Sequence, residues 1–164
     1  MKKPRLYIAS GMVFRISPDP AAESVLEMAE RIGWEVLDPR KLTDMEPLRK
    51  AQAMPFGQEQ RDAWAKVNAL IYKNNIAAIR SCDMILAMLN GMEPDSGTSF
   101  EVGFADSAGK KIEIYRDDFR DAGDNSGASV NLMLQCAAEK SSGKISRTIS
   151  EIEERLKTRL AECL

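Results

Sequence analysis

The chain has 164 residues, with 29% charged and 44% hydrophobic residues, which suits one globular domain with a single core. Its formal net charge is −2, and Lys and Arg are scattered among Asp and Glu, which disfavours nucleic acid and anionic membranes as partners. The sequence contains no histidine, which excludes a Ser-His-Asp triad and a histidine-based metal site.

The three cysteines are Cys82, Cys136 and Cys163, and their wide spacing predicts neither a zinc site nor a disulfide framework. Free thiols are typical of a reducing compartment. The apolar run at the N-terminus is too short for a signal peptide, and no stretch approaches the roughly 20 apolar residues of a membrane span. We therefore expect a soluble cytoplasmic protein.

The first half of the chain alternates between strand and helix patterns. In chain order, it predicts a strand at residues 5–9 ended by a Ser-Gly pair, a helix at 21–32, a second strand at 34–37, a long connection at 41–57 and a long helix at 58–81. The connection has mixed polarity and two prolines. Long connections in compact domains are often functional, so this one could close over a ligand as a lid.

The second half continues the alternation. In order, it predicts a buried strand at residues 83–89, a turn-rich loop at 90–97, a helix from 98 or 99 to about 108, a strand at 111–115, a polar loop at 116–129, an apolar segment at 130–138 and an amphipathic helix at 146–160.

This alternation predicts an α/β fold over residues 1–164 as a single domain. We expect a doubly wound, Rossmann- or flavodoxin-like architecture, with a mostly parallel five-stranded sheet and helices on both faces. Ligands in such folds bind beyond the carboxyl ends of the strands, where the strand order reverses. The loops that follow residues 5–9 and 83–89 should therefore carry the chemistry.

Residues 93–103 lie at that expected position. Glu101 falls in the first turn of the predicted helix, where the helix dipole should keep its carboxylate ionised. Such a carboxylate can attack an anomeric carbon and form a covalent glycosyl-enzyme. Asp95, six residues earlier, could exchange a proton with the departing base, and Gly97 would let the backbone approach a ligand. Two other interpretations stay open: Glu101 as a simple dipole partner, and the Gly-Thr-Ser cluster as a phosphate site.

Residues 83–109 (DMILAMLNGMEPDSGTSFEVGFADSAG) resemble the central block of the nucleoside 2-deoxyribosyltransferase family. Two further landmarks support the resemblance, namely the strand LYIASG at residues 6–11 and the segment NLM at 131–133. The resemblance therefore covers most of the chain and implies a single domain of this family, with a role in nucleotide salvage.

The resemblance implies a role for each landmark residue. Glu101 matches the nucleophile, Tyr7 the tyrosine that orients it, and Asp95 the carboxylate that binds and protonates the nucleobase. Asn131 and Met133 match residues that a neighbouring subunit contributes to the sugar site, with Asn131 holding the 5′-hydroxyl. The protein would then be at least a homodimer. From the residues alone, Tyr7 is an ordinary strand tyrosine and Asn131 an ordinary loop-end residue.

Further substrate contacts are expected from Ser10, Gly11, Phe14 and Asn75. Asn75 marks a departure, because some family members carry a second base-contacting aspartate at this place. An amide can hydrogen-bond a base but cannot deliver a proton at neutral pH, so more of the proton transfer would depend on Asp95. Whether purines or pyrimidines are preferred stays open.

The expected activity is a ping-pong transfer of deoxyribose from a 2′-deoxynucleoside to a free nucleobase, with net retention, some side hydrolysis, and no cofactor or metal. Two alternatives remain. One is an N-glycosidase that hydrolyses 2′-deoxynucleoside 5′-monophosphates. The other is a non-catalytic module that binds nucleosides or nucleotides, since fold alone does not settle function.

Overall fold

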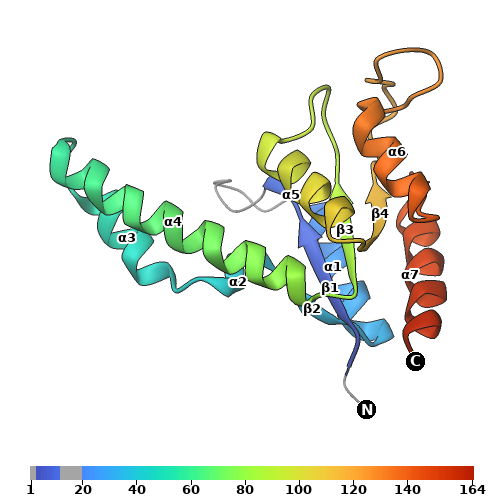
Figure 1. Cartoon of the computed structure of the whole chain (residues 1–164), viewed down its shortest axis with the longest axis horizontal. Coiled ribbons are helices and arrows are strands. Elements are labelled where there is room, and N and C mark those ends of the chain that lie inside the picture. The colour runs from blue at the N-terminus through green and yellow to red at the C-terminus, as the bar shows by residue number, and fades with distance from the viewer. Residues whose placement is uncertain (1–2, 12–19) are drawn as a thin grey trace.

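The computed structural model describes residues 3–11 and 20–164, and the described chain forms one sheet with helices packed on it (Figure 1). The sheet has five parallel strands in the order β2-β1-β3-β4-β5. The strands are β1 (Arg5–Ala9), β2 (Glu35–Leu37), β3 (Met84–Met88), β4 (Lys111–Tyr115) and β5 (Ile145–Ser146). The predicted α/β fold is therefore confirmed. The strand order reverses between β1 and β3.

Helices cover both faces of the sheet. The helices of the described residues are α1 (Pro20–Ile32), α2 (Pro39–Leu42), α3 (Met45–Ala53), α4 (Gln58–Ser81), α5 (Ser96–Ser107), α6 (Leu132–Lys140) and α7 (Ile149–Cys163). Alternate side chains of a strand point to opposite faces. Leu6 and Ile8 of β1 accordingly pack with α1 and α7, whereas Tyr7 and Ala9 pack with α4, α5 and α6. Tyr7 thus faces the same side as the helix that follows β3.

The prediction of a long connection at residues 41–57 is wrong, because α2 and α3 occupy most of that segment. Each helix begins at an aspartate whose side chain accepts a backbone N–H: Asp38 caps α2 and Asp44 caps α3. Pro39 and Pro47 lie in the first turns, where a missing N–H costs nothing. Of the two prolines in the predicted connection, Pro47 thus lies in a helix start, whereas Pro55 lies between α3 and α4 as a loop residue.

Two features near the C-terminus also differ from the prediction. The last helix begins at Ile149 instead of Ser146, and the side chain of Thr148 caps it. The residues just before it form β5, which hydrogen-bonds to β4 and completes the sheet. A strand of two residues has no periodicity that a sequence pattern could reveal. The apolar segment predicted at residues 130–138 is α6, and Asn131 is its N-cap.

The helical pair formed by α3 and the N-terminal half of α4, here called the arm (residues 45–70), extends away from the sheet (Figure 1). Leu48, Ala51 and Val67 form a small buried cluster between the two helices, separate from the two clusters on the sheet. In the described part of the chain, no helix combines the length and apolarity needed to cross a membrane.

Candidate active site

A cavity of about 430 Å³ lies at the carboxyl ends of β1 and β3, beside α4 and the start of α5. This is the reversal point of the strand order, where the sequence predicted the site. Its described lining residues are Ser10, Gly11, Ile71, Asn75, Asp95, Ser96, Gly97, Thr98 and Glu101. The volume falls within the range of small-molecule sites.

Glu101 receives two hydrogen bonds on the same carboxylate oxygen. The hydroxyl of Tyr7 donates to Oε1 over 2.7 Å, and the side-chain amide Nδ2 of Asn75 donates to Oε1 over 3.1 Å. No hydrogen bond from a described residue reaches Oε2. Oε1 is therefore fixed by two hydrogen bonds, whereas Oε2 is left for a ligand.

Burial raises the pKa of Glu101 to about 7. The two hydrogen bonds, from Tyr7 and Asn75, lower this pKa, and the nearby charge of Asp95 raises it. Since α5 begins at Ser96, Glu101 lies in the second turn and not in the first. The expectation that the helix dipole keeps the group fully ionised is therefore wrong: desolvation outweighs it, and near neutral pH the neutral and charged forms coexist.

Tyr7 stays protonated and serves as a donor. Its side chain is completely buried. Burial, and then the charge of Glu101, raise the pKa of Tyr7 far above its ordinary value. The bond between the two residues therefore has a fixed direction, from the phenol to the carboxylate.

Asp95 is the N-cap of α5, which begins at Ser96 and not at residue 98 or 99 as predicted. Its Oδ2 accepts the backbone N–H of Thr98 over 2.8 Å and the hydroxyl of Thr98 over 3.0 Å. Two glycines leave room for it: a Cβ at Gly11 would lie 3.0 Å from Cγ of Asp95, and one at Gly97 would lie 3.1 Å from Oδ2. The cap thus fixes the second carboxylate of the cavity.

Asn75 offers an unsatisfied acceptor. Its Oδ1 is buried and has no hydrogen-bond partner among the residues that the structure describes. A buried polar atom without a partner costs about 1–3 kcal/mol. The amide is oriented by its bond to Glu101, so the position at which the sequence departs from the family pattern is also directly in contact with the central carboxylate.

The loop between β3 and α5 is anchored by Arg116, whose side chain is completely buried. Its Nη1 donates to the carbonyl oxygens of Leu89 over 2.5 Å and Gly91 over 2.7 Å, and its Nη2 donates to that of Arg120 over 2.7 Å. The guanidinium therefore ties this loop to the one that follows β4. Nothing in the spacing of the sequence indicated this residue.

The remaining predicted residues are not all in the cavity. Ser10, Gly11 and Gly97 line it, and Ile71, Ser96 and Thr98 are additional lining residues that the sequence analysis missed. Ile71 could have been found, because it lies one helical turn before Asn75 on the same face of α4. Phe14 lies outside the described residues.

Asn131 and Met133 line a different cavity, of about 320 Å³, between α5 and α6. Oδ1 of Asn131 accepts the backbone N–H of Met133 over 3.0 Å as the cap of α6. The side chain of Met133 is 70% exposed. The structure therefore does not bring these two residues into the cavity of Glu101 within the same chain.

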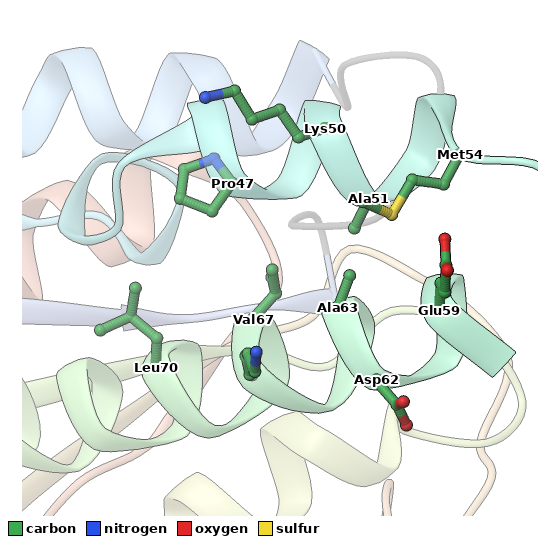
Figure 2. A pocket seen from close by; sticks show the side chains of 10 residues that line it. Pro47, Lys50, Ala51, Met54, Glu59, Asp62, Ala63, Val67 and Leu70 are labelled. Carbon is green, nitrogen blue, oxygen red and sulfur yellow. The ribbon is translucent and has the colours of Figure 1, made fainter.

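A larger cavity, of about 530 Å³, lies between α3 and α4 in the arm (Figure 2). Its lining is mainly apolar with lysine, glutamate and aspartate at the rim, and it does not include Glu101. Among the described residues, no group of three Cys, Asp or Glu side chains is placed to hold a metal ion.

Comparisons with known proteins agree with the fold. A sequence profile of the nucleoside 2-deoxyribosyltransferase family matches residues 6–133. No curated protein matches the chain in a sequence comparison.

Three solved structures have the same fold. A conserved protein from Enterococcus faecalis V583 is 15% identical, with 96% of this chain and 99% of that one covered and a TM-score of 0.67. A 2-desoxiribosyltransferase from Leishmania mexicana is 25% identical, with coverage of 94% and 97% and a TM-score of 0.59. A CMP N-glycosidase from Clostridium botulinum is 19% identical, with coverage of 93% and 97% and a TM-score of 0.52.

Proposed function

Because the chain belongs to the nucleoside 2-deoxyribosyltransferase family, we propose that it transfers 2′-deoxyribose from a deoxynucleoside to another nucleobase through a covalent bond to Glu101. The observation that carries this proposal is the arrangement around that residue. Its Oε1 accepts two hydrogen bonds, and no described residue donates a hydrogen bond to its Oε2. The carboxylate lines a cavity whose volume suits a small-molecule substrate.

In the first half-reaction, Oε2 of Glu101 attacks C1′ of the sugar while the bond from C1′ to the base nitrogen breaks. Asp95 supplies the proton that the departing base takes up. The transition state carries positive charge on the sugar ring, which a nearby carboxylate stabilises. Burial that raises the pKa of Glu101 also makes its carboxylate a stronger nucleophile once it is ionised.

In the second half-reaction, a new base enters the cavity and its nitrogen attacks C1′ of the glycosyl ester. The bond from C1′ to Glu101 breaks, the carboxylate is regenerated, and the proton of the incoming base returns to Asp95. Two displacements give net retention. Water that replaces the base gives deoxyribose, so slow hydrolysis accompanies transfer.

Tyr7 and Asn75 act as positioning residues in this scheme. Both hold Oε1 and thereby aim the opposite oxygen at the sugar. Ser10, Gly11 and Gly97 would contact the substrate, and Oδ1 of Asn75, which has no partner among the described residues, would accept a hydrogen bond from it.

We further propose that a second subunit completes each site with its Asn131 and Met133. The exposed side chain of Met133, and the absence of both residues from the described lining of their own chain's cavity, support a contribution in trans. Asn131 would then hold the 5′-hydroxyl of the deoxyribose bound in the neighbouring subunit.

The alternative substrate is a deoxynucleoside 5′-monophosphate, hydrolysed at the same carboxylate. The hydroxyls of Ser96 and Thr98 at the start of α5 favour it, because a helix N-terminus attracts phosphate. The charges oppose it: the described lining contains Asp95 and Glu101 but no Lys or Arg. With no cation among these lining residues to neutralise a phosphate dianion, we favour the unphosphorylated sugar.

The test is an incubation of the purified protein with thymidine or deoxyinosine plus adenine, followed by chromatography. The expected product is deoxyadenosine, and mass spectrometry of a single turnover should find deoxyribose on Glu101. The variant Glu101→Gln should lose exchange and labelling. Exchange that survives in this variant, or faster consumption of dTMP than of thymidine, would overturn the proposal.

A further inference from the structure

Arg116 is a buried cation that forms no ion pair with any described carboxylate. Its side chain is completely buried, whereas Arg120 and Arg147 nearby each pair with an aspartate. Burying a charge without a counter-ion is costly, and an apolar side chain of similar length would fill the same space without that cost. Packing of the core alone therefore does not account for an arginine at this position.

The guanidinium binds backbone carbonyl groups just after β3. Nη1 donates to the carbonyl oxygens of Leu89 and Gly91, and Nη2 donates to that of Arg120. Alternate carbonyls of an extended strand lie about 6.8 Å apart, which is more than two hydrogen bonds of 2.5 and 2.7 Å can bridge from one nitrogen. The backbone bends accordingly, and Gly91 has a φ of +100°, in the left-handed region that favours glycine. Arg116 thus holds the first turn of the loop that leads from β3 to α5.

Two single hydrogen bonds also join this turn to the loop after β4. The backbone N–H of Gly91 donates to Oδ2 of Asp118 over 3.2 Å. Oδ1 of Asn90 accepts the backbone N–H of Asp117 over 3.0 Å, in contact with water. Hydrogen bonds from a charged donor are stronger, and more so where water is excluded. Arg116 is therefore the main anchor of the turn.

The turn is one of two fixed points of the loop. Residues 92–94 make no hydrogen bond with any described residue, and Met92 is 51% exposed. The next fixed point is Asp95, which caps α5 and lies against Gly11. A shift of the anchored turn is therefore transmitted along a short unsupported segment to a carboxyl group that lines the cavity of Glu101.

We propose that Arg116 is a positioning residue for the reaction, because it holds the loop between β3 and α5 so that the carboxyl group of Asp95 can protonate the departing base. Arg116 is not among the described lining residues of the cavity, so it acts through Asp95 and not on the substrate. An arginine suits this task, because its planar fork carries donors on separate nitrogens, whereas a lysine has all its donors on one. The inference rests on the proposed function, in which Asp95 is the acid.

The first test compares Arg116→Met and Asp95→Asn, singly and combined, in the exchange of thymidine with adenine. Methionine fills the buried space but donates no hydrogen bond to the carbonyl groups. Arg116→Met should lower kcat by about tenfold or more with KM nearly unchanged. Because Arg116 acts through Asp95, the combined variant should be no slower than Asp95→Asn alone. Losses that multiply in the combined variant would overturn the proposal.

A second substrate gives an independent readout. 7-Methyl-2′-deoxyguanosine releases its base without protonation, so Arg116→Met should lower its kcat by less than about threefold. Gly91→Ala disturbs the same turn without removing a buried charge, because alanine is strained at this φ, and should show the same selective loss. An equal loss for both substrates in these two variants contradicts a role through the acid.

Arg147→Met is the matched control. Arg147 donates to the carbonyl oxygen of Asp118 over 2.6 Å and so holds the loop after β4, but it bonds to no residue of the loop before α5. It should change kcat for either substrate by less than about twofold. A selective loss as large as that of Arg116→Met would refute the assignment.

Hydrogen–deuterium exchange of residues 90–96 reports on the anchor without the reaction. It should be faster in Arg116→Met than in the native chain and unchanged in Arg147→Met. Unchanged exchange in Arg116→Met overturns the anchoring role even if the native chain transfers deoxyribose. A native chain that does not exchange bases refutes the proposed function instead, and with it the role of Asp95 on which this inference rests.

Discussion

The hydroxyl of Tyr7 lies 2.7 Å from Oε1 of Glu101, although 94 positions separate the two residues in the chain. The contact exists because Tyr7 points to the face of β1 that α5 covers, and because β1 and β3 are neighbours at the reversal of the strand order. It sets the geometry and the acidity of the carboxyl group at the same time.

The stability of the protein should depend on pH through Glu101. Its pKa is about 7 in the folded chain and near 4.5 when unfolded, so burial stabilises the neutral form. That contribution is present below the unfolded pKa and is lost as pH rises through 7. Glu101→Gln removes the buried charge and should raise Tm by about 3 °C or more at pH 8. At pH 4 the two proteins should melt together, and an equal difference at both pH values would contradict the pKa.

The pH profile of exchange should report the hydrogen bond from Tyr7. Since this bond lowers the pKa of Glu101, Tyr7→Phe raises that pKa above 7 and leaves less carboxylate at neutral pH. We expect kcat/KM at pH 7 to fall by about tenfold or more and to recover partly near pH 9. Tyr115→Phe removes a phenol that contacts Asp117 instead and should leave the acid limb in place. A uniform loss across the pH range would mean that Tyr7 acts only through packing.

The capping and proton-transfer roles of Asp95 can be separated. Asparagine is as good an N-cap as aspartate, so Asp95→Asn should keep the bond to Thr98 and change stability by less than about 1 kcal/mol. It cannot donate a proton, so kcat for thymidine should fall by about 10²–10⁴-fold. A substrate whose base leaves without protonation, such as 7-methyl-2′-deoxyguanosine, should lose much less. Equal losses for both substrates would rule out the acid role.

Completion of the site by a neighbouring subunit predicts complementation. Asn131→Ser keeps a capping oxygen for α6 but shortens the side chain, and should be nearly inactive on its own. Mixed after dissociation with inactive Glu101→Gln, it should regain about a quarter of native activity, because half of the dimers are mixed and each contains one intact site. Activity that stays at the level of the parents would show that each chain works alone.

The fold was readable from the sequence because its strands are buried on both faces. Residues 83–89 form a nearly continuous apolar run, interrupted only by Asp83 at its start, and the predicted bounds differ from β3 by one residue at each end. β5 was not located from the sequence because a strand of two residues shows no hydrophobic periodicity. α4 was predicted with its observed bounds, but α3 was missed because Pro47 and Pro55 suggested a loop, whereas Asp44 caps a helix whose first turn accommodates Pro47.

The position of the candidate site could be predicted from the sequence, but the raised pKa of Glu101 could not. Asp95 and Glu101 were placed together from the predicted strand topology, and Tyr7 was added through the family resemblance. The structure brings the three into one neighbourhood. The pKa of Glu101 depends on burial beneath α4 and on the amide of Asn75, which are long-range packing effects. A pattern of residue types along the chain contains no measure of desolvation.

α4 runs without a break from the arm to the cavity. Ile71 packs against the arm cluster and also lines the cavity, and Asn75 follows one turn later. An α-helix is stiff over this distance, so the helix that packs in the arm also sets the position of the Asn75 amide. Because the hydrogen bond from Asn75 lowers the pKa of Glu101, one continuous helix joins the packing of the arm to the acidity of the carboxyl group in the cavity.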